Sequence, residues 1–210
     1  MKIIRTSMLF FTGVIASVQF ANAQGGPVNV YFGLGTATNS SSGQQIDTFG
    51  TGRPFTTPAM GGTFGDLGAS LMLGKHYGIG GDFSWRTSQG AYAGLNYRPL
   101  FYNFDGIYQP TKSKRFAPEL RAGLGGVAVR YSISQRDCNQ FTGCSTSNQF
   151  VDSSSHFQVH MGAAARFYMT DHIFVRPSVE AHWVNNFFQF GSNWVPQYSV
   201  GVGYSFGNPE

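Results

Sequence analysis

The segment at residues 197–206 alternates strictly between apolar residues and small or polar ones. One face carries Tyr198, Val200, Val202, Tyr204 and Phe206, and the other carries Ser199, Gly201, Gly203 and Ser205. A period of two residues indicates a β-strand. In a soluble sandwich the apolar face packs on a second sheet, but here the opposite face has no bulk and the apolar face has aromatic residues at both margins. This pattern is typical of a lipid-facing strand of a membrane barrel.

The same two-residue period recurs in seven earlier segments. They cover about residues 28–34, 66–73, 77–86, 91–101, 116–124, 156–167 and 173–183. The connections after the first, fifth and seventh strands are long, those after the second, fourth and sixth are tight, and the one after the third is a short exception. An even number of strands with alternating connections predicts an all-β fold, namely an eight-stranded antiparallel transmembrane up-and-down β-barrel. The 28 glycines, the 20 phenylalanines and the low share of charged residues, 11%, fit many short strands with tight turns.

The N-terminus predicts export from the cytoplasm. Lys2 and Arg5 precede an apolar run at residues 8–15, and Ala21-Asn22-Ala23 forms a small-x-small cleavage site. Residues 1–23 are therefore expected to be a signal peptide, with residues 24–210 forming one barrel domain. The formal net charge of +4 loses Lys2 and Arg5 on cleavage, and the remaining +2 argues against nucleic-acid binding.

The chain contains two cysteines, Cys138 and Cys144, in a stretch rich in Ser, Thr, Asn and Gln. They are close enough in sequence to close a small loop. Outside the cytoplasm such a pair predicts a disulfide. We expect this disulfide to stabilise an exposed loop.

The eight alternating strands, the signal peptide and the aromatic-rich last strand resemble the small outer-membrane β-barrel superfamily of Gram-negative bacteria, which includes the barrel domain of outer-membrane protein A. The resemblance covers nearly all of the mature chain. It implies residence in the outer membrane, contact with outer-membrane lipid and insertion by the outer-membrane assembly machinery. We expect a monomer.

The face opposite the lipid carries most of the strand-borne charge. These residues are Asp82, Arg86, Arg98, Glu119, Arg121, Arg166, Arg176 and Glu180. The interior of an eight-stranded barrel is just wide enough for side chains to fill, so the first interpretation is a core plugged by ion pairs. The second is a narrow, weakly anion-preferring pore, since five arginines face three acids. The third is a soluble exported barrel of the lipocalin type, but that would need an apolar cavity lining.

The spacing of the histidines in the sequence does not indicate a metal site. His156 and His160 share one face of their strand but lie roughly 13 Å apart along it, too far for one ion. Pairing either with His182 requires an unknown register. We expect no cofactor and no enzymatic activity: the lipid A deacylases of this fold use a His-x-Ser pair, and the chain contains none.

The connection before the last strand is unusually aromatic. Phe187, Phe188, Phe190 and Trp194 lie there among Asn and Gln residues. One interpretation is an interfacial belt at the level of the headgroups, and the other is a surface-contact loop for an unknown external ligand. The sequence therefore predicts an integral outer-membrane protein with a structural or surface-interaction role.

Overall fold

Strands make up most of the described residues in the computed structural model, which covers residues 27–40, 43–47, 50–92, 94–139, 143–187 and 190–207. The strands are β1 (Val28–Ala37), β2 (Gln45–Ile46), β3 (Phe55–Thr56), β4 (Phe64–Met72), β5 (Tyr77–Arg86), β6 (Gly90–Tyr92), β7 (Leu95–Tyr108), β8 (Phe116–Asn139), β9 (Gly143–Tyr168), β10 (Ile173–Val184) and β11 (Trp194–Phe206). The predicted signal peptide lies outside the described residues. No helix among the described residues has the length and apolar character to cross a membrane.

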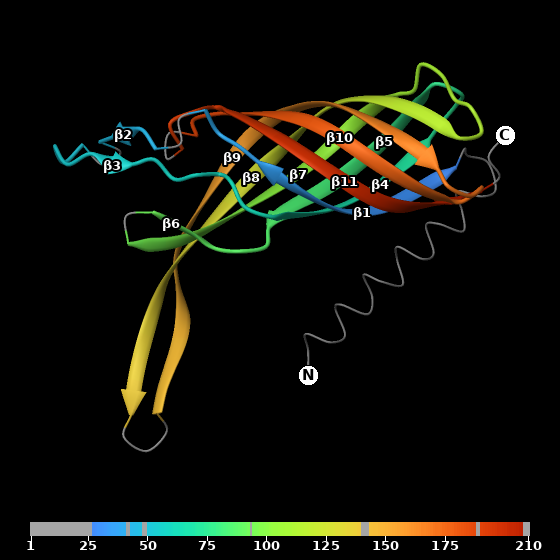
Figure 1. Cartoon of the computed structure of the whole chain (residues 1–210). Helices are drawn as coiled ribbons and strands as arrows, with labels where there is room; N and C mark the ends of the chain where they lie inside the picture. The colour runs from blue at the N-terminus through green and yellow to red at the C-terminus, as the bar shows by residue number, and fades with distance from the viewer. Residues whose placement is uncertain are drawn as a thin grey trace.

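Eight of these strands close into a ring (Figure 1). The order around the ring is β1, β4, β5, β7, β8, β9, β10 and β11, and each strand is antiparallel to its neighbours. Pairing of β1 with β11, from Val28 opposite Phe206 to Ala37 opposite Gln197, joins the first and last strands and closes the ring. Because neighbours in the ring follow one another along the chain, the barrel has up-and-down topology. The predicted fold class is confirmed.

Side chains alternate between the outer surface and the interior. On β11, Val200 and Val202 are 57% and 59% exposed, whereas Ser199 and Ser205 are buried. Bulky aromatic rings in the interior need glycine opposite them, because a larger residue would clash. A Cβ added at Gly203 would lie 2.3 Å from the ring of Phe174, and a Cβ added at Gly68 would lie 2.3 Å from the ring of Tyr31. The small residues on the inward face of β11 therefore make room for large side chains on neighbouring strands.

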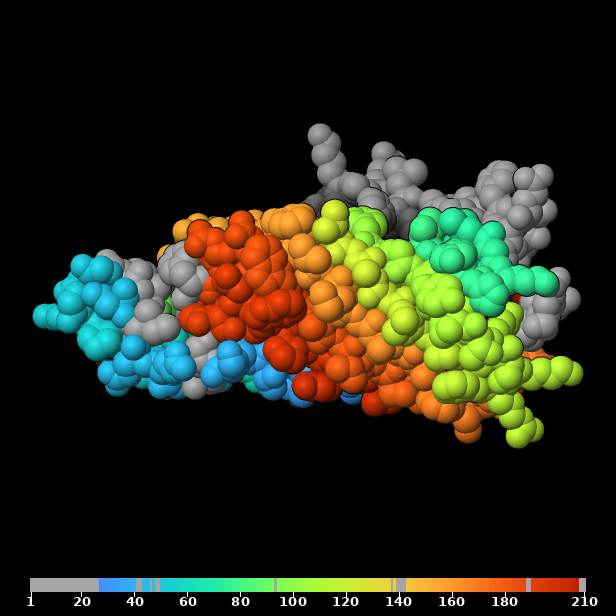
Figure 2. All heavy atoms as spheres, turned by 90° about the horizontal axis from the view of Figure 1, so that it is seen from above, coloured from blue at the N-terminus to red at the C-terminus, as the bar shows by residue number. Residues whose placement is uncertain are grey.

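The two ends of the barrel differ. The connections β4–β5, β7–β8 and β9–β10 are short and lie at one end, together with the start of β1 and the end of β11. The long connections lie at the other end, where β2 and β3 form a small separate hairpin (Figure 1). In the space-filling view this first connection, coloured cyan, extends the elongated body at one end, and the yellow-green β7–β8 turn marks the opposite end (Figure 2).

Two elements differ from the sequence prediction. The polar stretch around the cysteines is a hairpin: β8 and β9 remain paired out to Asn139 opposite Gly143, although β7 pairs with β8 only as far as Ser132. The hairpin projects well beyond the barrel (Figure 1). Backbone hydrogen bonds between its two strands stabilise it without an apolar face.

The second difference concerns residues 91–101, which do not form one alternating strand. A turn that includes Gly94, at φ +81°, separates β6 from β7. On β7, Tyr97 and Phe101 point inward and Arg98 is exposed, the reverse of the prediction.

Candidate functional site in the barrel interior

The interior has three layers. An apolar layer fills the end with the long connections, a charged layer fills the middle, and an arginine–aromatic layer fills the end with the short turns. The buried charged residues are Asp66, Asp82, Asp105, Glu119, Arg121, Arg166, Arg176 and Glu180, accompanied by the buried His160 and His182. Each comes from an inward position of a strand, so backbone pairing fixes where these groups meet.

Arg121 connects two carboxylates in the middle layer. Its guanidinium lies 3.4 Å from Oδ1 of Asp82 and 3.5 Å from Oδ2 of Asp105, and it donates a hydrogen bond to the hydroxyl of Tyr31. Asn103 also donates to Asp82, at 3.0 Å. Burial of charged groups is tolerated when they are paired in this way.

The histidines extend the network from β7 to β10. Nδ1 of His160 lies 2.8 Å from Oδ1 of Asp105, and its Nε2 lies 3.5 Å from Oε2 of Glu180. The β9–β10 register places His160 directly opposite His182, with the ring centroids 4.9 Å apart. The sequence could not supply this register, which brings together two histidines 22 positions apart in the chain.

Glu119 holds two arginines near the end with the short turns. It forms ion pairs with Arg166 and, at 3.4 Å, with Arg176. The guanidinium of Arg176 lies 4.2 Å from the ring centroid of Tyr31, and that of Arg166 lies 5.8 Å from the ring centroid of Phe174. These contacts over aromatic faces stabilise cations that are removed from water.

An apolar cap closes the interior at the end with the long connections. Its buried members are Ala37, Met60, Phe64, Tyr92, Tyr97, Phe101, Val127, Val129, Val184, Phe187, Phe190 and Val195. Asn39 ties two connections together here: its side-chain amide donates to the carbonyls of Pro58 and Phe190, and its side-chain oxygen accepts from the backbone N–H of Met60. The hydroxyl of Tyr97 donates to the carbonyl of Ala59.

Six of the eight residues predicted for the interior network lie in it, and two do not. Arg86 is half-buried at the rim of the barrel, with its guanidinium 5.3 Å from the ring centroid of Tyr97. Arg98 is exposed and lies on the outer face of β7, opposite Arg130 of β8. Arg86 thus has the predicted inward orientation but lies outside the ion-paired network. The face was misassigned only at Arg98, because apolar side chains fill the cap and an apolar residue at this end of a strand does not indicate the outer surface.

The prediction also missed Asp66 and Asp105, which are both buried. Asn103 and Asp105 share the face of Phe101, and two polar residues on a face assigned to lipid would have indicated that this face points inward. With Arg86 and Arg98 outside the network, five buried carboxylates face three buried arginines among the described residues. This reverses the arginine excess on which the anion-preferring pore was based.

The aromatic connection between β10 and β11 is divided between the cap and the surface. Phe187 and Phe190 are fully buried and stack at a centroid distance of 4.4 Å, so neither is available to an external ligand. Trp194 is 48% exposed. Phe188 lies outside the described residues.

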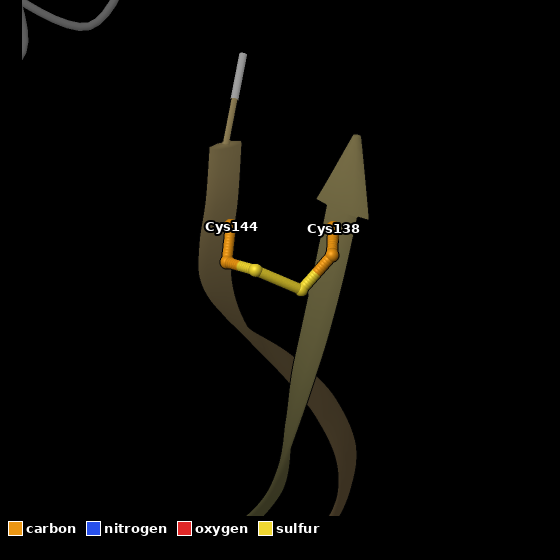
Figure 3. The surroundings of a disulfide bond; sticks show 2 residues. All are labelled: Cys138 and Cys144. Carbon is orange, nitrogen blue, oxygen red and sulfur yellow. A yellow bond between two sulfur atoms is a disulfide. The ribbon is translucent and has the colours of Figure 1, made fainter. Parts of the chain in front are cut away.

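The predicted disulfide is confirmed. Cys138 and Cys144 are bonded near the tip of the β8–β9 hairpin, facing each other across its two strands (Figure 3). The bond joins the strands far from the barrel and its charged interior.

Comparison with protein families agrees with this geometry. Residues 6–206 match the family model of the outer membrane protein beta-barrel domain. The chain belongs to this family. Outer membrane beta-barrel proteins reside in the outer membrane, and the exposed apolar band of this chain faces its lipid. A search of curated protein sequences gave no significant match.

Solved structures of other outer membrane barrels share the fold. Neisserial surface protein A is 14% identical, with a TM-score of 0.57 over 86% of this chain and 99% of that chain. Ail, the attachment invasion locus protein of Yersinia pestis, crystallised with the heparin analogue sucrose octasulfate, is 14% identical, with a TM-score of 0.54 over 87% of this chain and 99% of that chain. OprG of Pseudomonas aeruginosa is 13% identical, with a TM-score of 0.54 over 88% of this chain and 97% of that chain.

Proposed function

We propose that this outer-membrane barrel has a structural or surface-interaction role and does not act as an open channel. The observation that carries the proposal is the filled interior: the apolar cap, the ion-paired middle and the arginine–aromatic layer follow one another along the barrel axis. The interior of an eight-stranded barrel is just wide enough for side chains to fill, and here buried side chains fill it.

Conductance in planar bilayers tests this proposal. Folded protein purified in detergent is expected to give no conductance steps, and a known porin reconstituted in the same way serves as the positive control. Folding of each preparation is judged by its heat-modifiable mobility on a gel. Ohmic conductance steps from pure, fully folded protein would show that the interior layers leave a path for water, and they would favour the pore.

The surface role rests on what projects beyond the barrel. The β8–β9 hairpin is exposed on both strands, at residues 133–136 and 143–149. A variant in which a two-residue turn joins Ile133 directly to Phe150 removes this arm and leaves the barrel strands complete. We expect normal folding and weaker attachment of bacteria to host cells or to one another. Unchanged attachment would place the contact on another loop or leave the protein purely structural.

The outer face also carries a cation pair suited to anionic headgroups. Arg98 and Arg130 lie opposite each other, and Leu100, Tyr102 and Phe104 follow Arg98 in the apolar band. Like charges directly opposite each other destabilise a sheet, so a phosphate of the outer-leaflet lipid between them would be favourable. Substituting both arginines with Gln should lower thermal stability in lipopolysaccharide-containing vesicles and leave it unchanged in neutral detergent. An equal change in both media would exclude the lipid contact.

The proposal includes export by a signal peptide at residues 1–23, insertion by the outer-membrane assembly machinery and a monomeric barrel. N-terminal sequencing of the purified protein should start at Gln24. Light scattering in detergent should give the mass of one chain.

A further inference from the structure

Three side chains with metal-binding atoms converge in the charged layer. His160 of β9 lies opposite His182 of β10, and Glu180 is two residues before His182 on the same inward face. One ligand atom from each of the three lies within 4.8 Å of the other two. All three side chains are at least nine-tenths buried.

All polar side-chain atoms of this cluster except Nδ1 of His160 lack ordinary hydrogen-bond partners. Neither ring nitrogen of His182 and neither oxygen of Glu180 makes a hydrogen bond of normal geometry. The nitrogens nearest to Glu180 are Nε2 of His160 at 3.5 Å and the guanidinium of Arg176 at 3.9 Å. Buried polar atoms in native proteins are nearly always satisfied, so a group of unsatisfied atoms this close together needs a physical explanation.

The net charge of the barrel interior points to the same explanation. Among the described residues, five buried carboxylates face three buried arginines, which leaves two negative charges when the histidines are neutral. Uncompensated charge inside a barrel surrounded by hydrocarbon is strongly unfavourable. One divalent cation would supply the missing charge and the missing ligand contacts together.

We propose that His160, Glu180 and His182 bind a divalent transition metal of the zinc class. Two imidazoles and a carboxylate suit Zn²⁺, whereas Mg²⁺ and Ca²⁺ prefer oxygen ligands alone. The contact between Asp105 and Nδ1 of His160 leaves Nε2 on the side of Glu180, which is the usual way in which a carboxylate orients a metal-binding histidine.

A second group of potential ligands shares His160 but suits a cation less well. It consists of Asp82, Asp105 and His160. Both of its carboxylates pair with Arg121, at 3.4 and 3.5 Å, and this charge repels a metal ion, whereas Glu180 in the first group has its guanidinium neighbour, Arg176, farther away at 3.9 Å. The side of His160 that faces Glu180 and His182 is therefore the metal site. The ion would join β9 to β10 and stabilise the folded barrel, independently of any surface role.

Metal content of the refolded protein provides the first test. The chain is unfolded in urea with a chelator, refolded in detergent with either Zn²⁺ or Co²⁺ alone, and freed of unbound metal by gel filtration. We expect about one Zn²⁺ per folded chain and, with Co²⁺, the visible absorption bands of an ion with nitrogen and oxygen ligands. A folded wild-type barrel with no bound metal and no Co²⁺ spectrum would overturn the proposal.

Matched variants locate the site. His182→Gln should abolish metal binding, whereas His156→Gln, at a histidine that packs on Phe187 in the cap, should retain it. Folding of each variant is verified by heat-modifiable mobility. Metal binding retained by folded His182→Gln protein would assign the ion elsewhere, for example to surface histidines, and would also overturn the proposal. If His182→Gln does not fold, Glu180→Gln replaces it with the same expected loss of binding.

Discussion

Removing the buried carboxylate of Glu119 should destabilise the barrel more than removing an exposed carboxylate. Glu119 is the ion-pair partner of both Arg166 and Arg176, and all three side chains are about 97–98% buried. In the variant Glu119→Gln, Arg176 keeps Glu180 at 3.9 Å and the ring of Tyr31, whereas Arg166 keeps the hydroxyl of Tyr168 at 3.2 Å and the ring of Phe174. Breaking a buried ion pair by removing one partner costs about 3–5 kcal/mol. Because the Gln oxygen still accepts one hydrogen bond, we expect a loss of about 3 kcal/mol, the lower end of that range.

Urea unfolding in lipid vesicles measures this loss. Tryptophan fluorescence reports it, since Trp85, Trp183 and Trp194 lie on outward positions of their strands, and heat-modifiable mobility verifies the folded fraction. The matched control is Asp152→Asn, an exposed carboxylate on the hairpin, which should change the free energy of unfolding by no more than about 0.5 kcal/mol.

A double-mutant cycle separates the ion pair from general disruption. Arg166→Met alone should also destabilise the barrel, but the double variant with Glu119→Gln should lose less than the sum of the two single losses, by about 0.5–3 kcal/mol. A loss below about 1 kcal/mol for Glu119→Gln, or strictly additive losses, would refute the view that paired charges fill this interior.

Three further substitutions test the other layers and surfaces by the same unfolding assay. Val200→Arg places a charge on the lipid-facing surface of β11 and should cost about 2–4 kcal/mol, whereas Ser145→Arg on the hairpin should be neutral; equal effects would contradict the assignment of the lipid face. Phe190→Ala removes a fully buried ring of the cap and should cost about 3–5 kcal/mol, with Trp194→Ala as the exposed aromatic control; a neutral Phe190→Ala would mean that the cap is not packed. Substituting Cys138 and Cys144 with Ser should leave barrel stability within about 0.5 kcal/mol but speed proteolysis of the hairpin tip; a large loss of barrel stability would show that the hairpin and the barrel unfold together.

The sequence by itself determined the fold class, because a lipid-facing strand must repeat with period two and a small barrel must fill its inside with small or paired polar residues. That rule placed Glu119, Arg121, Arg166, Arg176 and Glu180 correctly in the interior. The same rule misplaced Arg98, since the cap is apolar on the inside and the pattern there no longer distinguishes lumen from lipid.

Only the tertiary structure decided which interior groups meet. Strand register is set by the closure of the whole ring, and it brought His160 opposite His182 and put Arg121 between Asp82 and Asp105. It also showed that Phe187 and Phe190 fold back into the barrel mouth, which local sequence could not reveal because the same aromatic residues suit a membrane interface. Pairing across strands far apart in the chain depends on all eight strands at once, so no single segment encodes it.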